Sequence, residues 1–350
     1  MSRTPLTALT FVLGLGCLGL VFAPAARGET AGAQSMARGE YARAVRELTV
    51  AAKAGDPQAQ LDLGMAIREG KGVAVDLGLA FKWIRQAADK DLAEAQFEIG
   101  QMKEDGEGTE KNPADAAEWY RKAAQQGNVP AMFALGELYR TGSGVAKDEA
   151  QAARWYRPAA DKNDIDSELA LGKLYQEGVG VPKNLNDAAV WFRKAAQLGA
   201  PEGRYQLALL LMGGDPAQLG AYRPSRNTRE AVQWLQAAAE QGYAPAQYSL
   251  AMAQLGGIAA SLDPPAAIGW LQQAADQGHP AALRQLGRLF QQGKVTPADP
   301  VRAFMYLDLA ARMGDQLASF ERDELGRGLA ASQQQQARRR AQDWLQIRGM

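Results

Sequence analysis

The chain has very little of the residue types that build catalytic and metal sites. Its 350 residues include one histidine, His279, and one cysteine, Cys17. A serine-protease triad requires a histidine, and structural zinc sites require several cysteine or histidine ligands. The single histidine therefore excludes most triads and histidine metal sites. We expect His279 to be a loop residue. Because Cys17 lies in an amino-terminal apolar run, the remaining chain has no thiol for a disulfide.

The chain also lacks an excess of charge of either sign. Lysine and arginine together number 39, and so do aspartate and glutamate. Proteins that bind nucleic acid usually carry a clear basic excess, so this balance argues against such a partner. The GxSxG and SxxK serine motifs and the GK[ST] of a phosphate-binding loop are absent as well. These absences predict a protein that is not an enzyme and needs no cofactor.

The amino terminus has the pattern of an export signal. Arg3 is basic, residues 6–22 form an apolar run, and Ala23-Pro24-Ala25 resembles a cleavage site. The run is short for a membrane span. We therefore expect residues 1–28 to be a removed signal peptide of the Gram-negative type. The protein is then periplasmic or secreted, and it meets a membrane only through a partner or an uncleaved signal.

Tryptophan, in contrast, recurs at regular intervals. Six of the seven tryptophans are separated by 36, 36, 36, 43 and 36 residues, and Tyr306 follows after 36 more. They are Trp83, Trp119, Trp155, Trp191, Trp234 and Trp270. A fixed period in the thirties is the signature of one supersecondary unit repeated along a solenoid.

The residues around each tryptophan predict an α-helix, which we call helix B. Alanine stands three residues before each tryptophan, and an Ala-Ala pair follows four and five residues after it, which places small residues and the indole on one helical face. The residue seven before is a preferred N-cap in every unit: Asp76, Asn112, Asp148, Asn184, Asn227, Asp263 and Asp299. The residue eight positions after each tryptophan, or after Tyr306 in the seventh unit, is of a type that tolerates a left-handed backbone, as the end of a helix requires. These residues are Asp91, Gly127, Asn163, Gly199, Gly242, Gly278 and Gly314.

A preceding helix, helix A, is predicted from alanines and Leu-Gly pairs such as Leu135-Gly136. Repeated glycine inside a helix implies that another backbone passes close by, because such a glycine lowers helix stability by about 1 kcal/mol. A glycine loop such as Gly142-Ser143-Gly144-Val145 joins helix A to helix B. Its recurrence at the same place in each unit favours a structural role over phosphate binding.

The combined pattern A-x-x-W-Y-x-x-A-A-x-x-G, preceded by L-G-x-x-Y-x-x-G-x-G-V-x-x-D, resembles the Sel-one-like repeat (SLR) family, a relative of the tetratricopeptide repeat. The clearest example runs from Leu135 to Ala160, and the resemblance covers about Pro57 to Gly314. It implies an all-α, right-handed α/α superhelical solenoid whose concave face binds proteins or peptides. Bacterial members are typically envelope adaptors or secreted factors. The cysteine-rich branch of the family is not matched.

The repeat register predicts the organisation of the chain. An N-terminal capping helix occupies residues 36–56 and is expected to be a lone helix B, with Glu47 in the tryptophan column. Seven repeats follow at 57–317, with an insertion near 213–227 in place of one glycine loop. Capping helices end the chain at 318–350.

The partner-binding surface is predicted by subtraction, since positions of helix A outside the core and cap columns are free to recognise a partner. The candidates are Asp62, Met65, Glu69, Glu98, Gln101, Asp105, Glu137, Lys173 and Glu177, with Arg223 and Arg226 in the insertion. The early units are acidic, which favours a basic peptide or protein patch. The alternative is that these residues form ordinary solvated helix faces.

The preferred functional hypothesis is an exported adaptor or scaffold that binds an unidentified protein or peptide in the bacterial cell envelope. A secreted factor that binds a host protein is an alternative that uses the same surface. A structural role in polysaccharide export machinery also stays open. A cell-wall or polysaccharide hydrolase is less favoured, because only a carboxylate pair from separate helices is left to perform it.

Overall fold

The computed structural model describes residues 31–213, 226–256 and 263–349, and these residues form eighteen helices and no strand. The first of each repeated pair, helix A, is α3 (Pro57–Glu69), α5 (Ala93–Asp105), α7 (Val129–Thr141), α9 (Ile165–Glu177), α11 (Pro201–Leu211), α13 (Ala244–Leu255) or α15 (Pro280–Gln292). The second, helix B, is α4 (Leu77–Ala88), α6 (Pro113–Gln125), α8 (Glu149–Ala160), α10 (Leu185–Gln197), α12 (Arg226–Glu240), α14 (Pro264–Asp276) or α16 (Pro300–Arg312). The ends are α1 (Ala31–Ala37) and α2 (Tyr41–Lys53), and α17 (Gln316–Arg327) and α18 (Ala331–Arg348).

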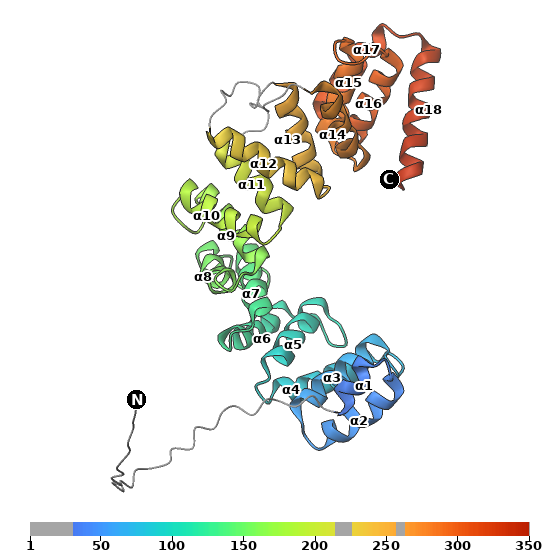
Figure 1. Cartoon of the computed structure of the whole chain (residues 1–350). Helices are drawn as coiled ribbons and strands as arrows, with labels where there is room; N and C mark the ends of the chain where they lie inside the picture. The colour runs from blue at the N-terminus through green and yellow to red at the C-terminus, as the bar shows by residue number, and fades with distance from the viewer. Residues whose placement is uncertain (1–30, 214–225, 257–262, 350) are drawn as a thin grey trace, which may run out of the picture.

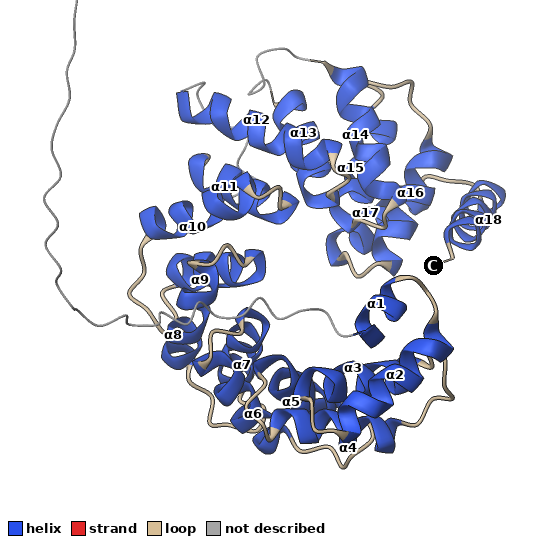
Figure 2. Ribbon diagram, turned by 60° about the horizontal axis from the view of Figure 1, so that its bottom comes forward, coloured by secondary structure: helices blue, strands red, loops and turns tan. Residues whose placement is uncertain are grey.

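The helix pairs stack into an α/α superhelical solenoid, so the predicted fold class is confirmed. Each helix A packs against its own helix B and against the helix B before it. Figure 1 shows the pairs following one another from end to end, with the first and last helices far apart. Seen along the superhelix, α3, α5, α7 and α9 form an inner layer, and α4, α6, α8 and α10 form an outer layer (Figure 2). The inner layer is the concave face.

The predicted start of helix B is confirmed in six of the seven repeats. Side-chain oxygens of Asp76, Asn112, Asp148, Asn184, Asp263 and Asp299 accept hydrogen bonds from first-turn main-chain amides. In the fifth repeat the prediction is wrong, because α12 begins at Arg226 and includes Asn227. The expected left-handed residue after helix B is present in all seven units, and even the non-glycine members, Asp91 and Asn163, have φ of 60° and 64°.

The deepest core position is the residue that follows each tryptophan. Tyr156 and Phe192 are completely buried, whereas Trp155 is only half-buried. The tryptophan reaches into the preceding repeat, as Trp119 does where it packs in one cluster with Ile84 and Leu92. The indole therefore stabilises the junction between neighbouring units, and the residue after it fills the space within its own unit.

The mid-helix glycine makes room for a side chain of helix B in the five repeats that have it. The expected close backbone is also present at Gly64, where a β-carbon would lie 3.1 Å from the main-chain oxygen of Ala80. A β-carbon at Gly136 would lie 2.4 Å from the ring of Tyr156 in the same repeat. The second loop glycine does meet a backbone. A β-carbon at Gly144, where φ is 72°, would lie 2.3 Å from the main chain of Pro113 at the start of the previous helix B.

Both ends of the solenoid are closed by degenerate units. The expected lone N-terminal helix is wrong, because α1 pairs with α2 as a helix A would. At the other end α17 takes the place of a helix A, and α18 packs on α16 through Ala337, Ala341 and Trp344. The predicted signal peptide lies outside the described residues. Within the described ranges, no helix has both the length and the apolar character that a membrane span requires.

Candidate functional site

The concave face contains a groove where α7, α9 and α11 lie next to one another. Its volume is about 410 Å³, and its lining residues are Phe133, Glu137, Arg140, Asp166, Leu169, Ala170, Lys173, Leu174, Glu177 and Glu202. The floor is apolar, since Leu169 and Leu174 are almost completely buried and Phe133 is half-buried. Charged side chains line the rest. Such a combination suits a segment of another protein better than a small apolar ligand.

The helical repeat explains why these residues share one face. The lining residues on α9 are related by spacings of three and four residues, and they are Asp166, Leu169, Ala170, Lys173, Leu174 and Glu177. Residues at those spacings lie on one side of an α-helix. The opposite side of α9 carries Leu171 and Gly172, which pack against the outer layer. The groove is therefore the inner surface that the core leaves uncovered.

One ion pair crosses the groove between α9 and α11. Lys173 Nζ lies 2.8 Å from Glu202 Oε1. Lys173 is the ninth residue of its helix, and Glu202 is the second residue of the next helix A. One repeat earlier, the same two positions hold Glu137 and Asp166. That junction thus presents two carboxylates to the groove.

The two carboxylates differ in how they are compensated. Arg140 donates to Glu137 at 2.9 Å from Nε and at 2.6 Å from a terminal nitrogen, and the Tyr156 hydroxyl donates to it as well. Burial acts to raise the pKa of Glu137, but these hydrogen bonds outweigh it and leave the pKa lowered.

Asp166 has no hydrogen-bond or ion-pair partner among the described residues. Desolvation, followed by the negative charges of Asp164, Glu202 and Glu137, raises the pKa of its carboxyl group. Asp166 and Glu177, which also has no such partner among the described residues, are the lining carboxylates that the groove leaves uncompensated.

The groove contains three of the candidate partner-binding residues, Glu137, Lys173 and Glu177. The others on helix A lie on α3 and α5 in the first two repeats, away from this groove: Asp62, Met65, Glu69, Glu98, Gln101 and Asp105. Arg223 lies outside the described residues. Arg226 is the first residue of α12, and its side chain is not among those described.

The expectation of an acidic surface in the first two repeats is weakened by internal ion pairs. Arg68 pairs with Glu98 at 2.9 Å and also with Glu107 from the next glycine loop. Glu69 pairs with Lys71, and Asp62 accepts a hydrogen bond from Gln58. One arginine is thus shared by two glutamates, and the amide of Gln58 brings no charge to Asp62, so the acidic character of this surface is reduced but not removed.

Sequence reasoning missed several lining residues, above all Phe133, Arg140, Asp166 and Glu202. Asp166 and Glu202 share a column, the second residue of helix A, and each lies seven residues from the ninth position on the same helical face. That spacing was available in the sequence. The ion pair between successive repeats was not, because the sequence does not show which residues of neighbouring helices meet.

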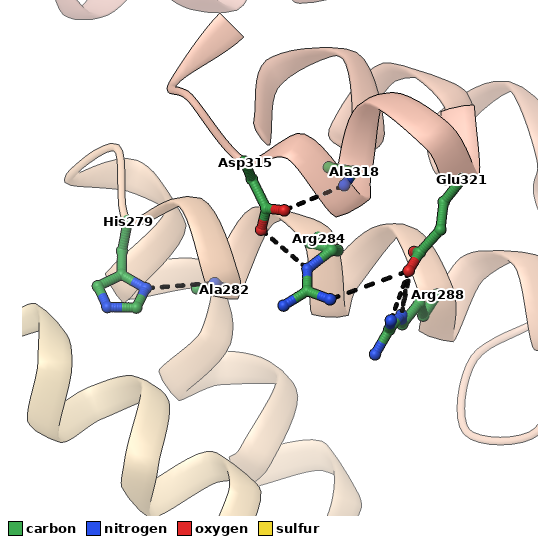
Figure 3. A network of polar contacts seen from close by, with 7 residues as sticks. All are labelled: His279, Ala282, Arg284, Arg288, Asp315, Ala318 and Glu321. Carbon is green, nitrogen blue, oxygen red and sulfur yellow. Dashed lines mark hydrogen bonds and ion pairs between the residues drawn. The ribbon is translucent and has the colours of Figure 1, made fainter. Parts of the chain in front are cut away.

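The seventh repeat has a different inner surface (Figure 3). Arg284 Nε donates to Asp315 at 2.8 Å, and Arg288 Nε donates to Glu321 of α17 at 3.0 Å. These ion pairs attach α17 to α15. Because Arg284 and Arg288 are held in these ion pairs, the charges at this end of the concave face are compensated within the chain.

His279 is confirmed as a residue outside the helices, and it has a structural role there. Its Nδ1 accepts a hydrogen bond from the Ala282 amide at 3.2 Å, so it is the N-cap of α15 (Figure 3). Its ring stacks on Tyr248, and burial lowers its pKa. Asn128 and Asp164 cap helix A at the same place in other repeats. Across the described part of the chain, no three His, Cys, Asp or Glu side chains gather as a metal site would require.

These features define an α/α superhelical repeat protein with an open inner groove. The Sel1 repeat sequence profile matches seven units, at residues 57–92, 93–128, 129–164, 165–199, 201–243, 244–279 and 280–315. The chain therefore belongs to the Sel1 repeat family, and the predicted resemblance is confirmed. Proteins of this family are generally scaffolds for protein–protein interaction and not enzymes.

Solved structures include similar proteins. A Sel1 repeat protein from Oxalobacter formigenes is 29% identical, with a TM-score of 0.60 over 72% of this chain and 96% of the other. A protective antigen of uropathogenic Escherichia coli with an SLR fold is 30% identical over 87% of this chain and 80% of the other, with a TM-score of 0.44. No curated protein sequence matches the chain at a significant level.

Proposed function

We propose that this chain is an exported adaptor of the bacterial cell envelope that binds a protein or peptide in the groove formed by α7, α9 and α11. The observation that carries the proposal is the groove itself, where an apolar floor and an uncompensated carboxylate lie on the concave face. The alanine, tryptophan, cap and glycine columns serve packing and helix ends, so they are not available for recognition. Export is supported by the pattern at residues 1–28.

Site-specific photo-crosslinking in cells tests the binding surface. A photoreactive residue replaces Glu177, which lines the groove, or Glu118, an exposed residue of helix B. We expect a discrete crosslinked protein from position 177 and none from position 118. The same products from both positions would contradict a partner in the groove.

Cell fractionation tests the location. We expect the chain in the periplasmic fraction, with an amino terminus near residue 29 by mass spectrometry. Recovery from the culture medium would favour the secreted factor that binds a host protein. An intact amino terminus in the cytoplasm would contradict export.

A further inference from the structure

We propose that the groove takes a basic segment of its partner, with one arginine or lysine side chain of that segment between Glu137 and Asp166. This inference rests on the proposed function and names the chemistry of the partner.

Equivalent positions of helix A carry different charges in successive repeats. The ninth residue of each helix A precedes the second residue of the next helix A along the concave face. At the junction of α9 and α11 these residues are Lys173 and Glu202, which form an ion pair of 2.8 Å. At the junction of α7 and α9 they are Glu137 and Asp166. The ninth position is therefore a lysine at one junction and a glutamate at the other, and Asp166 has no cation paired with it as Glu202 does.

The other junctions show that two carboxylates are unusual at these positions. The remaining pairs are Met65 with Glu94, Gln101 with Pro130, Leu209 with Pro245, and Met252 with Ala281. None of these pairs combines two charges of the same sign. The negative charge of Glu137 is one of those that raise the pKa of Asp166, an effect that a counter-charge would offset.

The cations that the chain itself supplies are already in use. Arg140 is held by Glu137, and Lys173 is held by Glu202. Asp166 is left with three negative neighbours, and its pKa is raised by desolvation and by those charges. A cation brought by a partner would form the ion pair that the neighbouring junction already has.

The floor of the groove suits the rest of such a side chain. Arginine and lysine pack their aliphatic stems on apolar surface while the charged end reaches a carboxylate. Leu169, Leu174 and the Phe133 ring supply that surface beside Asp166. An arginine can also stack its guanidinium group on an aromatic ring. The groove thus favours a basic residue with an apolar residue close to it in the partner segment.

Selection from a random peptide library tests the inference. Phage-displayed dodecapeptides are selected on the full mature protein and eluted by competition. The variant Asp166→Lys supplies the missing cation from the chain itself and fills the site. Glu94→Lys is the matched control, because it makes the same charge change at the second residue of α5, outside the groove.

We expect the enriched peptides to share a basic residue at a fixed distance from an apolar one. Replacing that basic residue with glutamine should weaken binding at least tenfold in fluorescence anisotropy. Asp166→Lys should cause a similar loss with an unchanged or higher melting temperature, whereas Glu94→Lys should stay within twofold. Binding should also weaken as ionic strength rises.

The possible failures are distinguishable. Peptides that block crosslinking from position 177 but share no basic residue would overturn the basic-segment inference and leave the groove adaptor in place. Equal binding to wild type and Asp166→Lys would overturn it too. If no crosslinked protein forms from position 177 in cells, and no selected peptide binds in the groove, the proposed function fails as well.

Discussion

The Nε2 atom of Gln60 donates a hydrogen bond to the main-chain oxygen of Ala52, 3.0 Å away, and so ties the start of α3 to the end of α2. The same contact, eight residues back along the chain, recurs at Gln96 with Ala88, Arg204 with Ala196, and Gln247 with Ala239. In four of the seven repeats, a donor at the fourth residue of helix A thus joins that helix to the helix B before it.

Glu168 occupies this position in the fourth repeat and is an exception. Its side chain is completely buried, and neither carboxylate oxygen has a hydrogen-bond partner. Only the protonated form can donate as its counterparts do. Desolvation raises the pKa of Glu168 to about 7, and Lys194 opposes this shift while Asp164 adds to it.

The first prediction concerns the pH dependence that follows. Because the folded-state pKa lies above the unfolded value of 4.5, Glu168 makes the protein less stable as pH rises from about 4.5 to about 7, and the loss persists above that range. The shift corresponds to a loss on the order of 3 kcal/mol. Glu168→Gln should therefore raise stability at pH 8 by about 1–3 kcal/mol, and much less at pH 4.

Urea unfolding at pH 4, 6 and 8 measures this effect. Glu118→Gln, which changes an exposed glutamate of the outer layer, is the control and should leave the pH profile almost unaltered. A Glu168→Gln profile parallel to that of wild type would show that Glu168 does not titrate in this range.

The second prediction compares adjacent residues of α8. Tyr156 is completely buried and Trp155 is half-buried. Tyr156→Ala should lower the free energy of unfolding by about 3–5 kcal/mol. Trp155→Ala should cost less, because part of the indole is in solvent in the folded state. Thermal melting of the two variants measures the order, and the reverse order would contradict the assignment of the deepest core column.

The third prediction uses two helical glycines. A β-carbon at Gly136 would lie 2.4 Å from the ring of Tyr156, whereas one at Gly269 would meet no atom within 4 Å. Gly269→Ala should stabilise the protein by about 0.5–1 kcal/mol through helix propensity. Gly136→Ala should destabilise it, because overpacking costs about 1–3 kcal/mol. Chemical denaturation distinguishes them, and a stabilising Gly136→Ala would contradict the tight contact with Tyr156.

The fourth prediction concerns the helix caps. Asp148 accepts hydrogen bonds from the amides of Ala150 and Gln151, so Asp148→Ala should cost about 1 kcal/mol. Asn227 lies inside α12, and Asn227→Ala should have little effect or stabilise slightly. Equal losses in denaturation experiments would mean that Asn227 does cap its helix.

Much of the local structure was predictable because it depends on short-range chemistry. An aspartate or asparagine seven residues before the tryptophan caps helix B through contacts within one turn, as Asp148 and Asn184 do. Asn227, inside α12, is the exception. Asp91 and Asn163 were recognisable as helix ends because few residue types tolerate a positive φ. The unit at residues 31–53 was harder to predict, since α1 is only seven residues long and has no Leu-Gly pair.

The candidate site was only partly predictable. The sequence indicated that variable positions of helix A face a partner, and Glu137, Lys173 and Glu177 do line the groove. It did not indicate that Arg68 neutralises Glu98, because that ion pair joins residues thirty positions apart. It also did not identify Asp166 as a carboxylate without a counter-charge.

The sequence by itself determined the repeat length, the helix ends and the order of the helices, because each depends on residues within one or two turns of one another. The tertiary structure decided which side chains of neighbouring repeats meet. Lys173 reaches Glu202 while Asp166 is left unpaired, although both carboxylates occupy the second position of helix A. The superhelical packing brings the ninth residue of one helix A to the second residue of the next. Because that ninth residue is Lys173 at one junction and Glu137 at the other, the charge of Glu202 is compensated and that of Asp166 is not.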